Sequence, residues 1–103
     1  MRWWRGRRGR RIGYPRVRFD VIGEPLIPRE WAAAGRVGPL EWSARLERAG
    51  DAVDWSLVVA GTLTGTERRS GTAANQYSAS DECKAALRGV IDEHNALADV
   101  AGG

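Results

Sequence analysis

The sequence predicts an α+β fold: an antiparallel β-meander of two to three strands packed on one C-terminal α-helix, with a basic, flexible N-terminal arm. Apolar and polar residues alternate in two segments between residues 40 and 60, and apolar residues recur at helical spacing after residue 80. The first 19 residues hold eight arginines and no acid. We therefore divide the chain into an arm at 1–15, a short strand and connector at 16–39, and a ββ(β)α domain at 40–103.

The arm differs sharply in charge from the rest of the chain. The protein has 103 residues and a net charge of +3, but residues 20–103 contain all 13 acids and only eight basic residues. Glycines interrupt the arginines of the arm, and such a segment cannot bury enough apolar surface to order itself when free. A strongly basic arm therefore precedes a mildly acidic body.

Two short elements are expected between the arm and the body. Apolar residues alternate with charged ones over 16–21, which predicts a short strand that follows Pro15 and ends at the turn Gly23-Glu24-Pro25. In the stretch "PREWAAAG", Pro28 suits a first helical position and a glycine follows the alanine run, so we expect one or two helical turns. Its Trp31 is expected to dock on the body.

The next two elements are alternating strands joined by a turn. Every second residue is apolar from Leu40 to Leu46 and again from Val53 to Val59. Gly50-Asp51 lies between the two segments and supplies a turn. The simplest arrangement is a hairpin that places Trp42 and Trp55 on one apolar face.

A third strand and a helix complete the predicted body. A Thr-rich strand is expected over 62–69, although a glycine within it weakens the pattern, and "SGTAANQ" after it is expected to be a loop. Ser78, with Asp81 three residues later, or Ser80 instead, suits the N-cap of a helix. This helix should cover the apolar face of the sheet. Its apolar stripe comprises Cys83, Ala86, Leu87, Val90, Ile91 and Leu97.

Residues 41–91 also resemble a known family. Trp55-x-Leu57, Ala60-Gly61 and Thr62-Leu63-Thr64, then Tyr77-Ser78 before an Ala-rich helix, are similar to the small YegP-like ββ(β)α modules (domain of unknown function 1508). Those modules carry a W-x-L-x-A-x-x-G strand and turn and a Y-S-S helix start. Here the segment between Thr64 and Tyr77 is long, and the turn residues differ. The resemblance implies a meander packed on a helix and allows pairing or duplication of such units, but it implies no activity.

The sequence predicts that the protein is not an enzyme and needs no cofactor or metal. One cysteine and one histidine exclude an internal disulfide, a cysteine-rich metal site and a histidine cluster within the chain. On one helix Cys83 and His94 would lie about 16 Å apart, far beyond the roughly 3 Å that a proton transfer needs. We expect Cys83 to be a small buried residue and His94 to be a partly exposed residue near the helix end.

The arm carries the predicted functional site. Its arginines would neutralise phosphates and release counterions, and its aromatic residues would stack on unpaired bases. Arginine-rich arms also suit RNA grooves and loops. We therefore predict a nucleic-acid-binding accessory protein that slightly prefers RNA to DNA. The predicted contact residues are Arg2, Trp3, Trp4, Arg5, Arg7, Arg8, Arg10, Arg11, Tyr14, Arg16 and Arg18.

Three other interpretations of the arm stay open. It would also suit docking on an acidic protein surface, of a partner or of another copy, in a complex such as a virion or a ribosome-like particle. Arg-Trp-Trp-Arg is typical of membrane-surface peptides as well, but residues 1–19 have no broad apolar face and an acidic body would be repelled by an anionic membrane. A dispensable solvated tail is the third interpretation.

The same composition sets the expected location. No apolar run approaches the roughly 20 residues of a membrane span. The basic start is not followed by the apolar region of a secretory signal, and a single cysteine suits a reducing compartment. We therefore expect a cytoplasmic protein.

Overall fold

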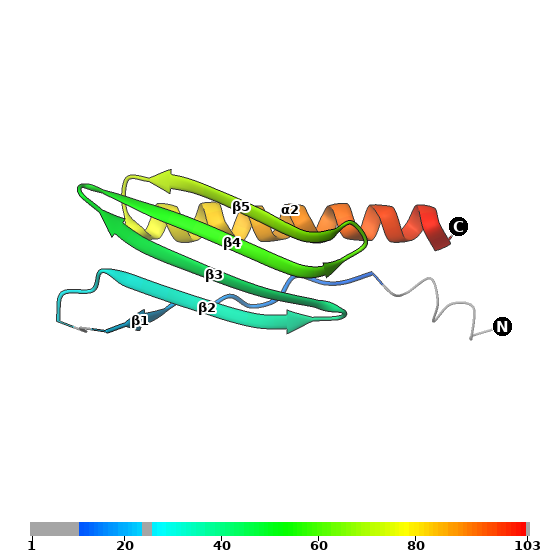
Figure 1. Ribbon diagram of the computed structural model, residues 1–103, viewed down its shortest axis with the longest axis horizontal. Coiled ribbons are helices and arrows are strands. Elements are labelled where there is room, and N and C mark those ends of the chain that lie inside the picture. Colours follow the sequence, from blue (N-terminus) through cyan, green and yellow to red (C-terminus); the bar gives the residue numbers. More distant parts are fainter. Residues whose placement is uncertain (1–10, 24–25, 103) are drawn as a thin grey trace.

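Figure 1 shows a five-stranded antiparallel sheet with one long helix packed against it. The structure is a computed structural model that describes residues 11–23 and 26–102. The strands are β1 (Asp20–Ile22), β2 (Glu30–Val37), β3 (Leu40–Ala49), β4 (Ala52–Thr62) and β5 (Gly65–Ala73), and the helix α2 spans Gln76–Gly102. Consecutive strands are neighbours in the sheet. The predicted α+β class is confirmed, with five strands instead of two or three.

β3 and β4 form the predicted hairpin. Trp42 pairs with Val59 and Leu46 pairs with Trp55, so the apolar residues of the two strands meet on one face of the sheet. In the connecting turn Gly50 has a φ of 63°, a conformation that glycine adopts without the steric cost of a Cβ atom. Alternation along each strand was therefore a reliable guide to which face is buried.

The helical turns predicted at "PREWAAAG" are wrong, because this stretch is strand β2. Trp31 pairs with Leu46 of β3 and Ala33 pairs with Ala44, and both β2 residues are buried. Alanine favours a helix by intrinsic propensity, but burial of alternate residues against β3 outweighs that preference. Trp31 does dock on the body, from a strand. The predicted connector at 16–39 thus contributes β1 and β2 to the same sheet as the hairpin.

The edges of the sheet also differ from the prediction. The strand expected over 16–21 is reduced to β1, and Val17 and Phe19 pack against the core without pairing in the sheet. β5 lies further along the chain than the strand predicted over 62–69, because Thr62 ends β4 and β5 includes residues 70–73, which were predicted to be loop. Part of the turn predicted at 23–25 lies outside the described residues.

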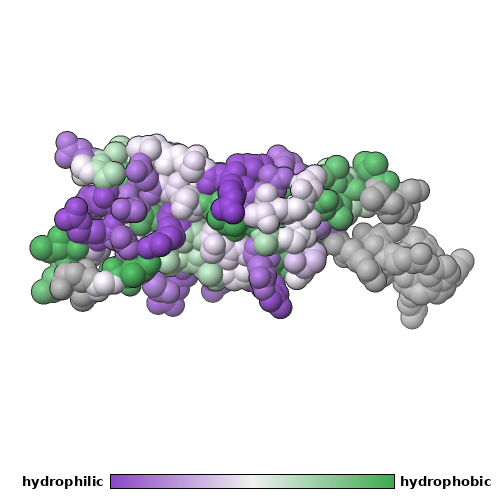
Figure 2. All heavy atoms as spheres, viewed as in Figure 1, coloured by the Kyte–Doolittle hydropathy of each residue, from purple (hydrophilic) through white to green (hydrophobic). Residues whose placement is uncertain are grey.

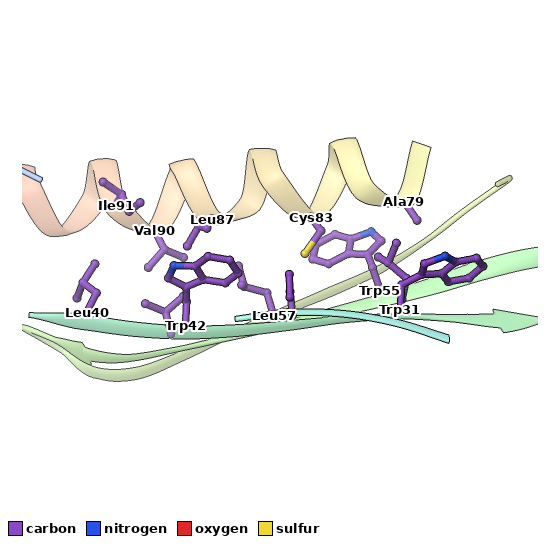
Figure 3. Packing of buried hydrophobic residues seen from close by; sticks show 14 of the residues in the cluster. Trp31, Leu40, Trp42, Trp55, Leu57, Ala79, Cys83, Leu87, Val90 and Ile91 are labelled. Carbon is purple, nitrogen blue, oxygen red and sulfur yellow. The ribbon is translucent and has the colours of Figure 1, made fainter. Parts of the chain in front are cut away.

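The hydrophobic core lies between α2 and one face of the sheet (Figure 3). Two indole rings in it cover glycines on neighbouring strands. A Cβ atom on Gly35 would lie 2.9 Å from the ring of Trp42, and one on Gly71 would lie 2.6 Å from the ring of Trp55. These strand glycines therefore make room for tryptophans that fill a thin core. From the helix the core receives Ala79, Cys83, Leu87, Val90 and Ile91.

Helix α2 begins before the predicted serine caps. The Oδ1 atom of Asn75 accepts a hydrogen bond of 2.9 Å from the backbone N–H of Ser78, so Asn75 is the capping residue. The predicted apolar stripe packs on the sheet, except that Leu97 is 43% exposed. His94, expected to be partly exposed, is buried at 8% exposure. Asn95 beside it is also buried, at 3% exposure.

Candidate functional site

The described part of the arm is fastened to the C-terminal half of α2 by a buried hydrogen-bonded pair. The backbone N–H of Ile12 donates to Oδ1 of Asn95 over 2.8 Å, and Nδ2 of Asn95 donates to the carbonyl of Ile12 over 2.9 Å. Ile12 is 9% exposed and Asn95 is 3% exposed. The amide of Asn95 satisfies both backbone groups of one residue, which would be costly to leave unpaired away from water.

Charged and aromatic contacts support this attachment on the surface. Arg11 forms an ion pair of 2.7 Å with Asp99, and the hydroxyl of Tyr14 donates to Asp92 over 2.7 Å. The hydrogen bond to this carboxylate raises the pKa of Tyr14, because it favours the protonated phenol. The guanidinium of Arg88 lies 5.5 Å from the centre of the Tyr14 ring, a cation–π distance. The start of the described chain is thus held at four successive points along the helix.

A cleft of about 220 Å³ opens between this segment and α2. Three of its lining residues are cations and none is an acid, and its apolar lining comes from the core side. Cations gathered around a concave surface raise the local positive potential and attract anions. We call this feature the basic cleft. It is lined by Pro15, Arg16, Val17, Lys84, Leu87 and Arg88.

The structure describes four of the predicted contact residues. Arg16 is exposed and lines the basic cleft. Arg18 lies 3.6 Å from the carboxylate of Asp20 in an exposed pair, whereas Arg11 and Tyr14 contact α2. The other predicted residues, at positions 2–10, lie outside the described residues.

Sequence reasoning missed the two helix residues of the basic cleft. Lys84 and Arg88 are four positions apart, so they lie on one side of α2, off the apolar stripe. This spacing was a visible signal of a basic helix side. Nothing in the sequence indicated that Arg16 would lie beside them, because that depends on the pairing of Ile12 with Asn95.

Acidic residues gather on the opposite face of the sheet, which α2 leaves open. Glu30, Glu47 and Asp54 are register neighbours on β2, β3 and β4. Arg45 contacts Glu30 at 3.0 Å, and Thr72 donates to Asp54 over 2.7 Å. We call the three carboxylates the acidic row. They border a shallow concavity of about 670 Å³, and Figure 2 shows mainly hydrophilic and neutral residues over the strands.

The cysteine and the histidine are both buried in the core region. Burial raises the pKa of the Cys83 thiol to about 11, so it is protonated at neutral pH and a poor nucleophile. Nδ1 of His94 is buried without a hydrogen-bond partner in the described structure. Within residues 11–23 and 26–102, no group of three or more His, Cys, Asp or Glu side chains is arranged to hold a metal ion. The same described residues contain no helix that is both long enough and apolar enough to cross a bilayer.

Known proteins give no independent indication of function. No protein-family model, curated protein or solved structure matches the chain. A function must therefore be inferred from the basic cleft, the acidic row and the sequence of the arm.

Proposed function

We propose that the protein binds nucleic acid through the basic cleft and the arm that precedes it. The observation that carries this proposal is the grouping of Arg16, Lys84 and Arg88 around one cleft without an acid. The segment that lines this cleft continues toward the N-terminus into five arginines at positions 2–10. Arg16 of the cleft and the arginines of the arm lie on the same N-terminal segment of the chain, and several cations along one segment suit a chain of phosphates.

The three cleft cations have complementary roles in this proposal. Arg16 and Arg88 offer planar guanidinium groups that bind phosphate oxygens through two hydrogen bonds, and Lys84 adds a compact charge. Stacking of Arg88 on Tyr14 orients its guanidinium before binding. The cleft would therefore hold a phosphate group at a fixed place on the helix.

The arm supplies the preference for single strands. Trp3 and Trp4 would stack on unpaired bases, and each such contact contributes about 1–3 kcal/mol in single-stranded complexes. Arginine-rich segments fold on RNA loops and grooves as they bind, which places RNA slightly ahead of DNA. Duplex DNA, whose bases are already stacked, would bind through phosphate contacts alone.

The charge distribution also supports binding on one side of the molecule. The acidic row occupies the open face of the sheet, whereas the basic cleft lies between residues 11–19 and α2. Phosphates would be repelled by the first surface and attracted by the second. We therefore propose that the polyanion binds at the basic cleft and not on the open face of the sheet.

The test measures binding of labelled single-stranded RNA, single-stranded DNA and duplex DNA by fluorescence anisotropy at several salt concentrations. Replacing the three cleft cations (Arg16→Gln, Lys84→Gln and Arg88→Gln) should weaken binding and lower the salt slope by about 2, since each phosphate contact on a single strand contributes about 0.7.

A matched control removes the same charge elsewhere. Arg29, Arg36 and Arg48 lie away from the basic cleft and are exposed, so their joint replacement by glutamine should leave the salt slope close to that of the wild type. Equal losses of nucleic-acid affinity in the two triple variants would show that binding depends only on the net charge of the protein. Binding that does not weaken with salt would overturn the proposal altogether.

The acidic row supports a second candidate function, which is docking of the arm on an acidic protein surface. Three carboxylates on adjacent strands form such a surface on another copy of the chain. Replacing Glu30, Glu47 and Asp54 by their amides should then reduce self-association and leave nucleic-acid affinity unchanged or higher. Light scattering with and without residues 1–10 distinguishes this mode, because only arm-dependent association disappears with the deletion.

A further inference from the structure

β5 is a long edge strand with no partner on its outer side in the described part of the chain. It spans nine residues, contains no proline and pairs only with β4. The other edge strand, β1, has three residues and is bordered in sequence by Pro15 and Pro28. Short edges near prolines resist pairing with other chains, whereas a long regular edge presents a row of free backbone donors and acceptors.

We propose that two copies of the protein pair antiparallel through β5, joining their five-stranded sheets into one sheet with the two α2 helices side by side. This proposal does not rest on nucleic-acid binding. Its occupant is a second copy of this chain, and the reason is that β5 is complementary to itself in a register that also aligns Arg68 of one copy with Asp54 of the other.

That register is centred on Ser70. A two-fold axis there places Ser70 opposite Ser70, Arg69 opposite Gly71 and Arg68 opposite Thr72 of the second copy. Small residues then face long ones, and no like charges lie directly opposite each other. Centring the pair on Arg68 or Arg69 instead would set an arginine against itself, which is unfavourable between neighbouring strands.

The open face of the joined sheet gains a matching charge pair. Arg68 is exposed on β5, and Thr72 is the register partner of Asp54 on β4. In the Ser70-centred pairing, Arg68 of one copy therefore lies in line with Asp54 of the other, two strand spacings or about 10 Å away between backbones. An arginine and an aspartate side chain together span most of this distance over the small Thr72.

The position of α2 permits this pairing. The helix packs on β4 and β5 (Figure 1), close to the free edge. If its axis lies midway between these strands, a two-fold axis half a strand spacing outside β5 sets the two helices about 10 Å apart. Packed helices lie 8–10 Å apart, so the second copy would fit against α2 without moving it.

The side of α2 nearest β5 has a small residue near its middle. Glu82 contacts Trp55, and Glu93 contacts Arg69 of β5, and Gly89 lies between these two glutamates on the same side of the helix. A Cβ atom on Gly89 would meet nothing within 4 Å. Folding of one copy therefore does not require this glycine, which is less favourable than alanine within a helix.

With the two-fold axis at Ser70, the two helices would pass each other near Cys83, because its Sγ lies 4.0 Å from the carbonyl oxygen of Ser56, the register partner of Ser70. Gly89 lies six residues further along α2, about 9 Å from that point.

Cysteine cross-linking tests the proposed register. Residues directly opposite each other on antiparallel strands have Cα atoms 4.5–5.5 Å apart, within the range of a disulfide. Ser70→Cys should therefore give a covalent dimer under mild oxidation at least ten times faster than two controls. Ser56→Cys lies on the same face of a central strand, and two copies of Thr66→Cys would be roughly 27 Å apart on the paired edges. The native Cys83 is 2% exposed and should not react.

Charge reversal gives an independent test that does not rely on a disulfide. Arg68→Glu should weaken the dimer at least tenfold in sedimentation equilibrium without nucleic acid, and adding Asp54→Arg to the same chain should restore it. Circular dichroism establishes that each variant is folded. The proposal would be overturned if Ser70→Cys cross-linked no faster than Ser56→Cys, or if Thr66→Cys cross-linked as fast as Ser70→Cys. A dissociation constant of the dimer that Arg68→Glu leaves unchanged would also overturn it.

Discussion

Replacement of Asn95 by alanine should destabilise the protein more than any other substitution of a polar residue on α2. The change removes both hydrogen bonds to Ile12, of 2.8 and 2.9 Å, in a place where neither partner is more than 9% exposed. Each intramolecular hydrogen bond contributes about 0.5–1.5 kcal/mol net, so the two together contribute about 1–3 kcal/mol. This loss of stability has an upper limit of about 2–3 kcal/mol. If the segment around Ile12 leaves the helix, water hydrates its backbone groups, and the remaining cost is the exposure of the Ile12 side chain.

Urea unfolding followed by tryptophan fluorescence measures this loss. The midpoint should fall with little change in the slope, provided that unfolding stays two-state. Asn75→Ala is the matched control, because it removes one exposed capping bond and should cost only about 1 kcal/mol. A loss below about 1 kcal/mol for Asn95→Ala would refute the reasoning and show that the Ile12 contacts do not hold the arm in solution.

Asn95→Asp adds a pH-dependent version of the same experiment. The ionised carboxylate would still accept from the N–H of Ile12 but would oppose its carbonyl, which raises the pKa of the introduced acid in the folded state above its ordinary value of about 4. Because the folded state then holds its proton to a higher pH than the unfolded state, the stability of this variant should fall as the pH rises above about 4. Relative to wild type it should recover at lower pH, where the protonated acid donates to the carbonyl.

Three further predictions concern glycines and the buried cysteine. Gly71→Ala should lower the free energy of unfolding by about 1–3 kcal/mol through overpacking, because its Cβ atom would lie 2.6 Å from the Trp55 indole. A Cβ atom on Gly89 would meet nothing within 4 Å, so Gly89→Ala should raise the free energy of unfolding by up to about 1 kcal/mol at concentrations where the chain is monomeric, and the two melting temperatures should move in opposite directions. Gly61→Ala should be still more harmful, since φ is +89° and the Cβ atom would lie 2.4 Å from a backbone carbonyl oxygen; wild-type stability in urea would contradict this. Because burial raises the pKa of Cys83 to about 11, the unfolded thiol ionises at lower pH than the folded one, so stability should fall as the pH rises above about 9, and Cys83→Ala should remove that part of the pH dependence.

Local pattern was sufficient for the elements whose neighbours in the chain are also their neighbours in space. Alternation identified the hairpin of β3 and β4 and placed Trp42 and Trp55 on its buried face. Helical spacing identified the face of α2 that packs on them. Each of these patterns indicates which face of a strand or helix is buried, and about a dozen consecutive residues are enough to recognise it.

Local pattern failed where burial depended on a distant segment. Pro28, the alanine run and Gly35 favoured a helix at 28–35, but pairing of Trp31 and Ala33 with β3 made residues 30–35 part of a strand. His94 was expected to be partly exposed because it lies near the end of the helix, yet packing near the turn between β4 and β5 buries it.

The sequence by itself determined that a basic arm precedes an α+β body, because charge and periodicity are properties of the chain. Only the tertiary structure decided where the described end of that arm, around Ile12, lies. Ile12 and Asn95 are 83 positions apart, and their pairing depends on the path of the whole sheet. That pairing brings Arg16 beside Lys84 and Arg88. The same path leaves β5 without an outer partner in the described structure, because strand order is settled only when every strand has been placed.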